Sequence, residues 1–123
     1  MSGARLIATA AALAALAAAP LADGAPRTPA RLQVSADEFT LVLSRSSIRA
    51  GSAVVELVNY GEDDHDLALR RNAKGARTFR IRTVRPGTTG ELDARLPAGR
   101  YRLWCTLPQH RARGMSATFV VRL

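Results

Sequence analysis

Residues 101–115 read YRLWCTLPQHRARGM, and this segment contains three side chains that bind soft metal ions. Leu103 and Cys105 alternate with their neighbours, which predicts a β-strand that turns both side chains to the same face. His110 and Met115 follow Cys105 at the spacing Cys-x4-His-x4-Met, ahead of a second apolar alternation. A loop of this length can fold back so that its three potential ligands meet at one point. The segment therefore predicts a strand, a ligand-bearing loop and another strand.

A fourth candidate ligand, His65, lies earlier in the chain. His65, Leu67 and Leu69 fall on one face of a predicted strand, so the imidazole is expected to point into the apolar interior. A buried imidazole needs hydrogen bonds or a metal ion for its ring nitrogens. Two imidazoles and a thiolate, with a weak axial thioether, form the ligand set of an electron-transfer copper site. We therefore predict one copper ion, cycling between Cu(I) and Cu(II), with the ligands His65, Cys105, His110 and Met115.

Each of these residues has an ordinary alternative role. Cys105 alone could be a small buried hydrophobe, and Met115 alone could fill the core. His110 could be a surface histidine and His65 a hydrogen-bonded core residue. The chain has one cysteine and two histidines, however, and their order, spacing and strand placement all agree with one four-ligand site. This agreement favours a metal site over four separate roles.

The rest of the sequence predicts an all-β domain. Short apolar-rich segments are separated by turn signals such as Pro86-Gly87, and no long helical stretch competes with them. The predicted strands lie near residues 32–34, 39–43, 53–60, 65–69, 79–81, 101–105 and 117–123. About seven to eight short strands with regular turns are typical of a β-sandwich or barrel. In the last strand we expect an inward row of Ala117, Phe119, Val121 and Leu123.

The N-terminal residues have the pattern of a secretory signal. Arg5 precedes an almost wholly apolar run over residues 6–19, and Pro20 closes it. A positive residue followed by a short apolar stretch is typical of a signal peptide. The alternative is a retained membrane anchor, but spanning a bilayer takes about 20 apolar residues. We expect a signal peptide over residues 1–22, a flexible leader over 23–30, one domain over 31–123, and export to the periplasm or the extracellular space.

The chain is strongly basic, with a formal net charge of +8 and 17 arginines among its 18 basic residues. Such a charge indicates an acidic protein partner or an anionic membrane surface, the latter if the signal segment is retained. We expect no nucleic-acid partner, because export separates the chain from nucleic acid and aromatic residues do not interleave with the basic ones. The basic run from Arg70 to Arg85 is expected to be the exposed face of a strand and its connection. Arg111 and Arg113 lie within the ligand loop, either as solvated arginines or as contacts for an acidic redox partner.

Three segments resemble the cupredoxins, the small blue-copper proteins. Residues 59–67 (NYGEDDHDL) resemble the strand, turn and first histidine of that family, and residues 99–105 (GRYRLWC) resemble its penultimate strand. Residues 115–121 (MSATFVV) resemble its closing strand. The ligand spacing is most similar to that of auracyanin and rusticyanin, with a longer loop from cysteine to histidine than in plastocyanin. The resemblance implies a Greek-key β-sandwich with a mononuclear copper at one end, and a redox protein such as a cytochrome or an oxidase as partner.

Two positions depart from the family pattern. Glycine often precedes the second histidine in cupredoxins, and here the residue is Gln109. Asparagine commonly follows the first histidine, where its side chain ties the two ligand loops together, and here the residue is Asp66. We hypothesise that Asp66 plays this part by accepting hydrogen bonds from the region of Thr106, as groups around a metal's ligands often do.

The predicted function is that of an exported one-electron carrier, with His110 as the point where electrons enter and leave. A copper-storage or copper-delivery protein is the alternative, and a binding module with a vestigial site is a third. A cysteine held at the end of a strand favours the carrier over the delivery protein. We expect no enzymatic activity, because Cys105 and His110 on one loop lack an orienting third group and no serine–histidine–carboxylate order is present.

Overall fold

The structure is a computed structural model that describes residues 1, 3–5, 7–19 and 24–123. The predicted signal segment ends at residues 20–22, which lie outside the described residues. In the described residues, no helix is long and apolar enough to span a membrane. The strands are β1 (Ala30–Asp37), β2 (Thr40–Leu43), β3 (Ser47–Arg49), β4 (Gly51–Asn59), β5 (His65–Arg71), β6 (Thr78–Val84), β7 (Thr89–Leu96), β8 (Gly99–Trp104) and β9 (Ser116–Arg122).

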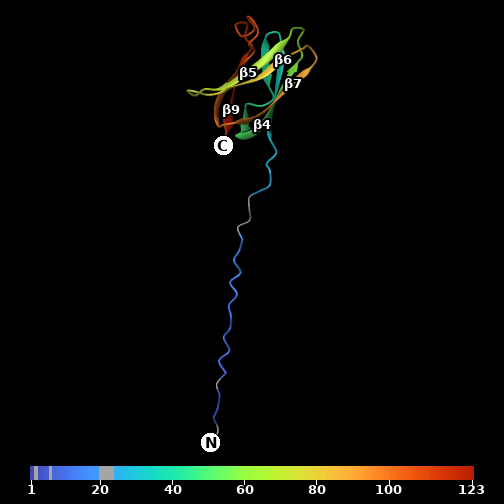
Figure 1. Cartoon of the computed structure of the whole chain (residues 1–123). Coiled ribbons are helices and arrows are strands. Elements are labelled where there is room, and N and C mark those ends of the chain that lie inside the picture. The colour runs from blue at the N-terminus through green and yellow to red at the C-terminus, as the bar shows by residue number, and fades with distance from the viewer. Residues whose placement is uncertain (2, 6, 20–23) are drawn as a thin grey trace.

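These strands form two sheets that pack face to face (Figure 1). One sheet has the order β2-β1-β4-β7 and the other the order β3-β9-β8-β5-β6. Both sheets are mixed, because β1 pairs with β4 and β3 pairs with β9 in parallel, whereas the other pairs are antiparallel. The predicted all-β sandwich is therefore confirmed.

The structure has nine strands rather than about seven to eight. The additional strands are β3, which has three residues, and β7, which carries few apolar side chains. In β7 only Leu96 is buried, while Leu92 and Ala94 are half-buried and their neighbours are exposed. The apolar alternation in these two segments is too short or too weak to mark a strand, and pairing with a neighbouring strand holds them in place.

The core fills the space between the two sheets. In the first sheet, Leu32 lies opposite Val55 and Val34 opposite Leu57, and all four side chains are fully buried. The second sheet contributes inward rows that include Leu67 and Leu69 of β5, Tyr101 and Leu103 of β8, and Phe119 and Val121 of β9.

Two details of the predicted strands are wrong. Leu123 is fully exposed instead of facing inward, because β9 ends at Arg122 and no strand pairs with the last residue. Phe39 lies in the turn between β1 and β2, not in a strand, and it packs half-buried against the core. Its apolar side chain continues the alternation of β2, but the backbone there makes the tight turn of a hairpin.

The strand ends bring the candidate ligands to one end of the sandwich. β5 begins with His65, β8 ends one residue before Cys105, and β9 begins one residue after Met115. Because β8 is antiparallel to both β5 and β9, the start of β5, the end of β8 and the start of β9 coincide. Figure 1 shows the loop between β8 and β9 at the opposite end of the domain from the C-terminus.

Candidate metal centre

The side chains of His65, Cys105 and His110 converge, and their ligand atoms all lie within 4.8 Å of one another. The Nδ1 atoms of His65 and His110 are 3.2 Å apart, and His110 Nδ1 lies 3.5 Å from Cys105 Sγ. With metal–nitrogen bonds of about 2 Å and metal–sulfur bonds of about 2.3 Å, one ion can reach all three atoms. His65 and Cys105 are fully buried, and His110 is half-buried.

Met115, the fourth predicted ligand, is also fully buried. Its backbone N–H donates to the carbonyl of His110 at 3.1 Å, and its carbonyl accepts from the N–H of Cys105 at 3.1 Å. These two hydrogen bonds close the ligand loop, residues 105–115, and anchor Met115 next to both Cys105 and His110. A role for its thioether as the weak axial ligand stays a prediction.

The orientation of His65 is set by Glu38. The Nε2 atom of His65 lies 3.0 Å from Oε1 of Glu38, at the turn between β1 and β2. A carboxylate accepts but does not donate, so Nε2 carries the proton and Nδ1 keeps its lone pair. The Nδ1 atom is the one that faces His110 and Cys105. A carboxylate that holds a histidine in this tautomer is a common support of metal ligands, because it turns the free nitrogen toward the ion.

Glu38 also holds the loop that leads into β5. Its carboxylate accepts the backbone N–H of Asp63 at 2.7 Å and that of Glu62 at 3.1 Å. The loop passes so close that a Cβ on Gly61 would clash with the Glu38 carboxylate, which is held in place by its hydrogen bonds. The hydrogen bond from Asp63, followed by that from Glu62, lowers the pKa of Glu38 from 4.5 to about 2. The role of Glu38 is not visible in the sequence, because the residues it contacts lie more than twenty positions further along the chain.

A stability prediction follows for the metal-free protein. Because the pKa of Glu38 is lower in the folded state, its contribution to stability is complete above pH 4.5 and is lost as the pH falls toward about 2. We expect the melting temperature to fall across this window, and to fall less in Glu38→Gln than in the wild type. Glu62→Gln is the matched control, since the exposed Glu62 side chain makes none of these contacts. Equal acid sensitivity in Glu38→Gln and the wild type would contradict the assignment.

The thiol of Cys105 is fully buried. Burial raises the pKa of this thiol, because a thiolate without a cation is poorly solvated in the core. A metal ion supplies the positive charge that stabilises the thiolate, so binding displaces the thiol proton. Among the described residues, Cys105 has no cysteine partner and remains a free thiol.

The ligand loop is shaped by two residues with positive φ angles. Gly114 has a φ of 118° and Gln109 a φ of 67°. The left-handed region is easily reached by glycine and is unfavourable for other residues. Gln109 occupies the position at which the resemblance leads one to expect glycine, and its positive φ angle is one that glycine adopts more readily. Hydrogen bonds from the N–H groups of His110 and Gly114 to Leu107 and Arg111 complete two tight turns.

The hypothesis for Asp66 is confirmed in its geometry. Asp66 Oδ1 accepts the backbone N–H of Thr106 at 2.6 Å, and Oδ2 accepts the Thr106 hydroxyl. These contacts tie the start of β5 to the residue that follows Cys105. The position of His65 relative to Cys105 is thus held by side chains as well as by the pairing of β5 with β8.

Asn59, at the end of β4, is a second residue whose role the sequence did not reveal. It is fully buried, and its side-chain amide donates to the carbonyls of Asp63 at 2.7 Å and Val84 at 2.9 Å. Its Oδ1 accepts the N–H of Gly61 at 2.8 Å. Asn59 therefore fastens the loop before His65 to the end of β6 at Val84. An asparagine at a strand end reads as an ordinary turn residue, so only its burial marks it.

His110 is half-buried, whereas the other two converging ligands are fully buried. The ring of Phe39 packs against it edge-on, with centroids 5.0 Å apart. The guanidinium of Arg113 lies over Phe39 at 4.7 Å, and that of Arg111 lies over the Trp104 ring at 4.9 Å. The two loop arginines thus stack on aromatic rings, and cation–π contacts hold them there.

The comparisons with known proteins agree with this architecture. No protein-family model matches the sequence, and no curated protein does. Auracyanin B superimposes with a TM-score of 0.63 at 20% identity, covering 80% of this chain and 94% of that chain. Auracyanin A is a "blue" copper protein from the green thermophilic photosynthetic bacterium Chloroflexus aurantiacus. It superimposes with a TM-score of 0.62 at 16% identity, covering 77% of this chain and 100% of that chain. Amicyanin from Paracoccus versutus superimposes with a TM-score of 0.54 at 20% identity, covering 80% of this chain and 86% of that chain.

The fold is that of the cupredoxins. In this cupredoxin sandwich, two imidazoles and a buried thiol meet beside a buried methionine at one end. The donor set combines soft sulfur, which suits Cu(I), with imidazole, which suits Cu(II). The cluster therefore fits a type 1 copper site.

Proposed function

We propose that this protein is an exported one-electron carrier that holds a single copper ion. The proposed ligands are His65, Cys105, His110 and Met115. The observation that carries the proposal is the convergence of His65 Nδ1, His110 Nδ1 and Cys105 Sγ, of which His65 and Cys105 are fully buried and His110 is half-buried. Copper would supply a one-electron redox couple at this point, and the chain's own residues would hold the ligands still.

Rigid support of the ligands favours electron transfer over copper delivery. Glu38 holds the His65 ring, Asp66 holds the residue after Cys105, and backbone hydrogen bonds close the loop between Cys105 and Met115. A ligand set that moves little between oxidation states lowers the reorganisation that accompanies each electron. A delivery site would instead need ligands that open readily. Four protein donors would also leave no open coordination position for a substrate, so the proposal includes no catalytic reaction.

Export is part of the proposal, and Arg5 followed by the apolar run over residues 6–19 supports it. We also propose a signal peptide over residues 1–22, a leader over 23–30 and one domain over 31–123. The first strand, β1, begins at Ala30. A single free cysteine is compatible with an oxidising compartment once a metal ion holds it.

A titration with Cu(II) tests the proposal. We expect the protein to be recovered from the exported fraction, with the mass of a chain that lacks its signal peptide. This protein should bind one equivalent of Cu(II) and turn intensely blue. One-electron reduction should bleach the colour and reoxidation should restore it, without loss of copper. Zn(II), which has no redox chemistry, should bind at the same stoichiometry and stay colourless. Colourless copper binding with rapid release would assign the protein to storage or delivery, and no binding would reject the site.

A further inference from the structure

The two sheets differ sharply in charge. The strands of the first sheet carry more carboxylates than cations, with Asp37, Glu56, Glu91 and Asp93 against Arg31 and Arg95. The strands of the second sheet carry one carboxylate, Asp66, whose oxygens are occupied by Thr106. The cations of the second sheet are Arg49, Arg70, Arg71, Arg80, Arg82, Arg100, Arg102 and Arg122. The outer face of the second sheet is therefore strongly positive.

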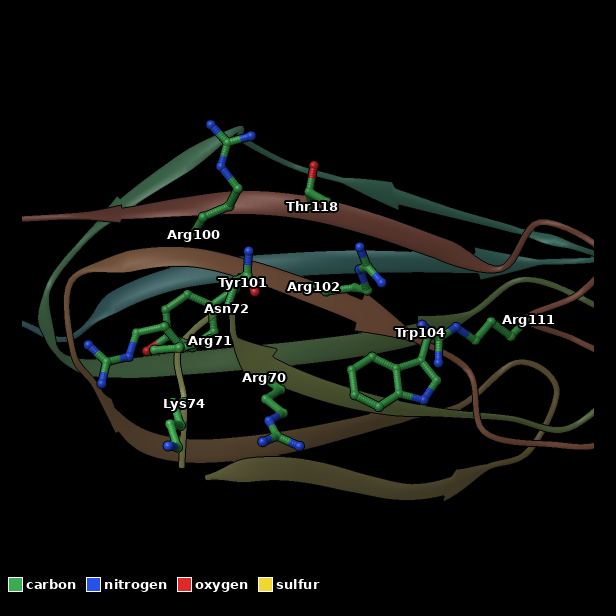
Figure 2. Close-up of a pocket in the computed structure, with 11 residues that line it drawn as sticks. Arg70, Arg71, Asn72, Lys74, Arg100, Tyr101, Arg102, Trp104, Arg111 and Thr118 are labelled. Atoms are coloured by element: carbon green, nitrogen blue, oxygen red, sulfur yellow. The ribbon is translucent and has the colours of Figure 1, made fainter. Parts of the chain in front are cut away.

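A groove of about 650 Å³ crosses this positive face over β5 and β8. Its cationic lining consists of Arg70, Arg71, Lys74, Arg100, Arg102 and Arg111. We call it the arginine groove. Figure 2 shows the groove with Trp104 and Arg111 toward one end and Arg71 and Lys74 toward the other, and with Thr118 of β9 at the edge. Among the described residues, no carboxylate lines the groove.

The arrangement does not stabilise the fold. Arg70 of β5 lies directly opposite Arg102 of β8 in the strand register, and both side chains are exposed. Like charges directly opposite each other destabilise a sheet pair. In the described part of the chain, neither arginine has a carboxylate oxygen within 4.0 Å, whereas Arg31 on the other sheet pairs with Glu56. The unpaired charges of the groove are available to an external anionic surface.

The groove also reaches the proposed copper site. Trp104 lines it and is covalently joined to Cys105, and Arg111, which covers the Trp104 ring, is covalently joined to His110. A molecule seated on the groove would thus contact residues adjacent to two of the proposed ligands. Proximity of this kind is what an electron donor or acceptor requires.

We propose that the arginine groove is the docking surface for an acidic redox protein, which exchanges electrons with the copper site past Trp104. This inference rests on the proposed function and names the chemistry of its partner. A protein is favoured over an anionic membrane because membrane-surface binding combines cations with apolar side chains that insert. Here Trp104 is half-buried under the Arg111 guanidinium instead, and Tyr101, which also lines the groove, is buried. In each exchange one electron passes between the partner's redox centre and the copper, and no proton or group is transferred.

Binding is measured first, on the metal-free protein, so that the result does not depend on copper. The probe is cytochrome b5, a small acidic haem protein, and calorimetry gives its affinity at low and high ionic strength. The test variant is Arg70→Gln/Arg102→Gln. The matched control is Arg49→Gln/Arg122→Gln, which removes the same charge from another pair of opposed, exposed arginines, at the far end of the same sheet.

We expect the groove variant to bind cytochrome b5 roughly tenfold more weakly than the control at 10 mM ionic strength, because electrostatic attraction is strongest where screening is weak. The difference should nearly vanish at 0.3 M salt. With copper bound, the rate of oxidation of reduced cytochrome b5 should fall by the same factor. Cytochrome c, a basic protein of similar size, is the control partner. Its binding should not be weaker in the groove variant than in the wild type.

Three results would overturn the proposal. If both double variants lost the same affinity for cytochrome b5, the effect would come from net charge and not from the groove. If the wild type did not bind cytochrome b5 at 10 mM ionic strength, the proposal that the partner is acidic would be rejected. Tighter binding to phosphatidylserine vesicles than to cytochrome b5, lost in the groove variant, would assign the face to a membrane. None of these results bears on the copper titration, and a failed titration would leave the calorimetry valid as a test of the surface.

Discussion

Replacing Cys105 by alanine is expected to abolish the intense visible absorption of the Cu(II)-loaded protein and to weaken copper binding by more than about 100-fold. The absorption of such a site arises from charge transfer between thiolate and copper, and Cys105 is the only cysteine in the chain. Changes to residues that merely support ligands typically lower metal affinity by 10–100-fold, so loss of the thiolate itself should exceed that range. Absorption spectroscopy during a Cu(II) titration measures both effects.

The variant should remain folded, which makes its loss of colour interpretable. Cys105 is a small, fully buried residue, and its Sγ lies 3.5 Å from Nδ1 of His110. Alanine leaves at most a small cavity, and the far-ultraviolet circular dichroism should match that of the wild type. Cys105→Ser is the companion variant, since a hydroxyl keeps the polarity but is a hard, weakly acidic donor. Retention of the blue band in Cys105→Ala would eliminate Cys105 as the ligand.

Replacing Asn59 by alanine is expected to lower the free energy of unfolding of the metal-free protein by about 3 kcal/mol, because each buried group left unpaired costs about 1–3 kcal/mol. The change leaves the buried carbonyl of Val84 without its partner, together with two partly buried groups, the carbonyl of Asp63 and the N–H of Gly61. Such a loss is a large part of the 5–15 kcal/mol typical of a domain. Urea unfolding followed by circular dichroism measures it.

Asn72→Ala is the matched control, because Asn72 is an exposed asparagine in the connection after β5 and only its backbone N–H is hydrogen-bonded. Its effect should stay within about 0.5 kcal/mol, as for surface substitutions in general. Asn59→Ala should in addition weaken Cu(II) binding, since the loop it fastens leads directly into His65. An unfolding free energy equal to that of Asn72→Ala would show that water replaces the lost hydrogen bonds.

Local patterns predicted most of the strands and the place of the ligands on them. The alternation through Leu103 and Cys105 and through Leu67 and Leu69 reports on neighbours two residues apart, so the buried face is visible in the sequence itself. The same reasoning failed where local pattern and tertiary contact disagree. Phe39 continues an apolar alternation but lies in a turn, and β7 has a weak alternation but is held by eight paired positions along β4.

The sequence by itself determined the β-class, the spacing of Cys105, His110 and Met115, and the burial of His65, because these depend on residues close together in the chain. Tertiary structure alone decided that Glu38 would set the tautomer of His65, and that Asn59 would fasten the loop before it. It also decided that Arg70 would lie opposite Arg102 beside Trp104. These contacts join residues whose meeting depends on which strands become neighbours and in what register. That choice is made by the packing of the whole core, and no local segment records it.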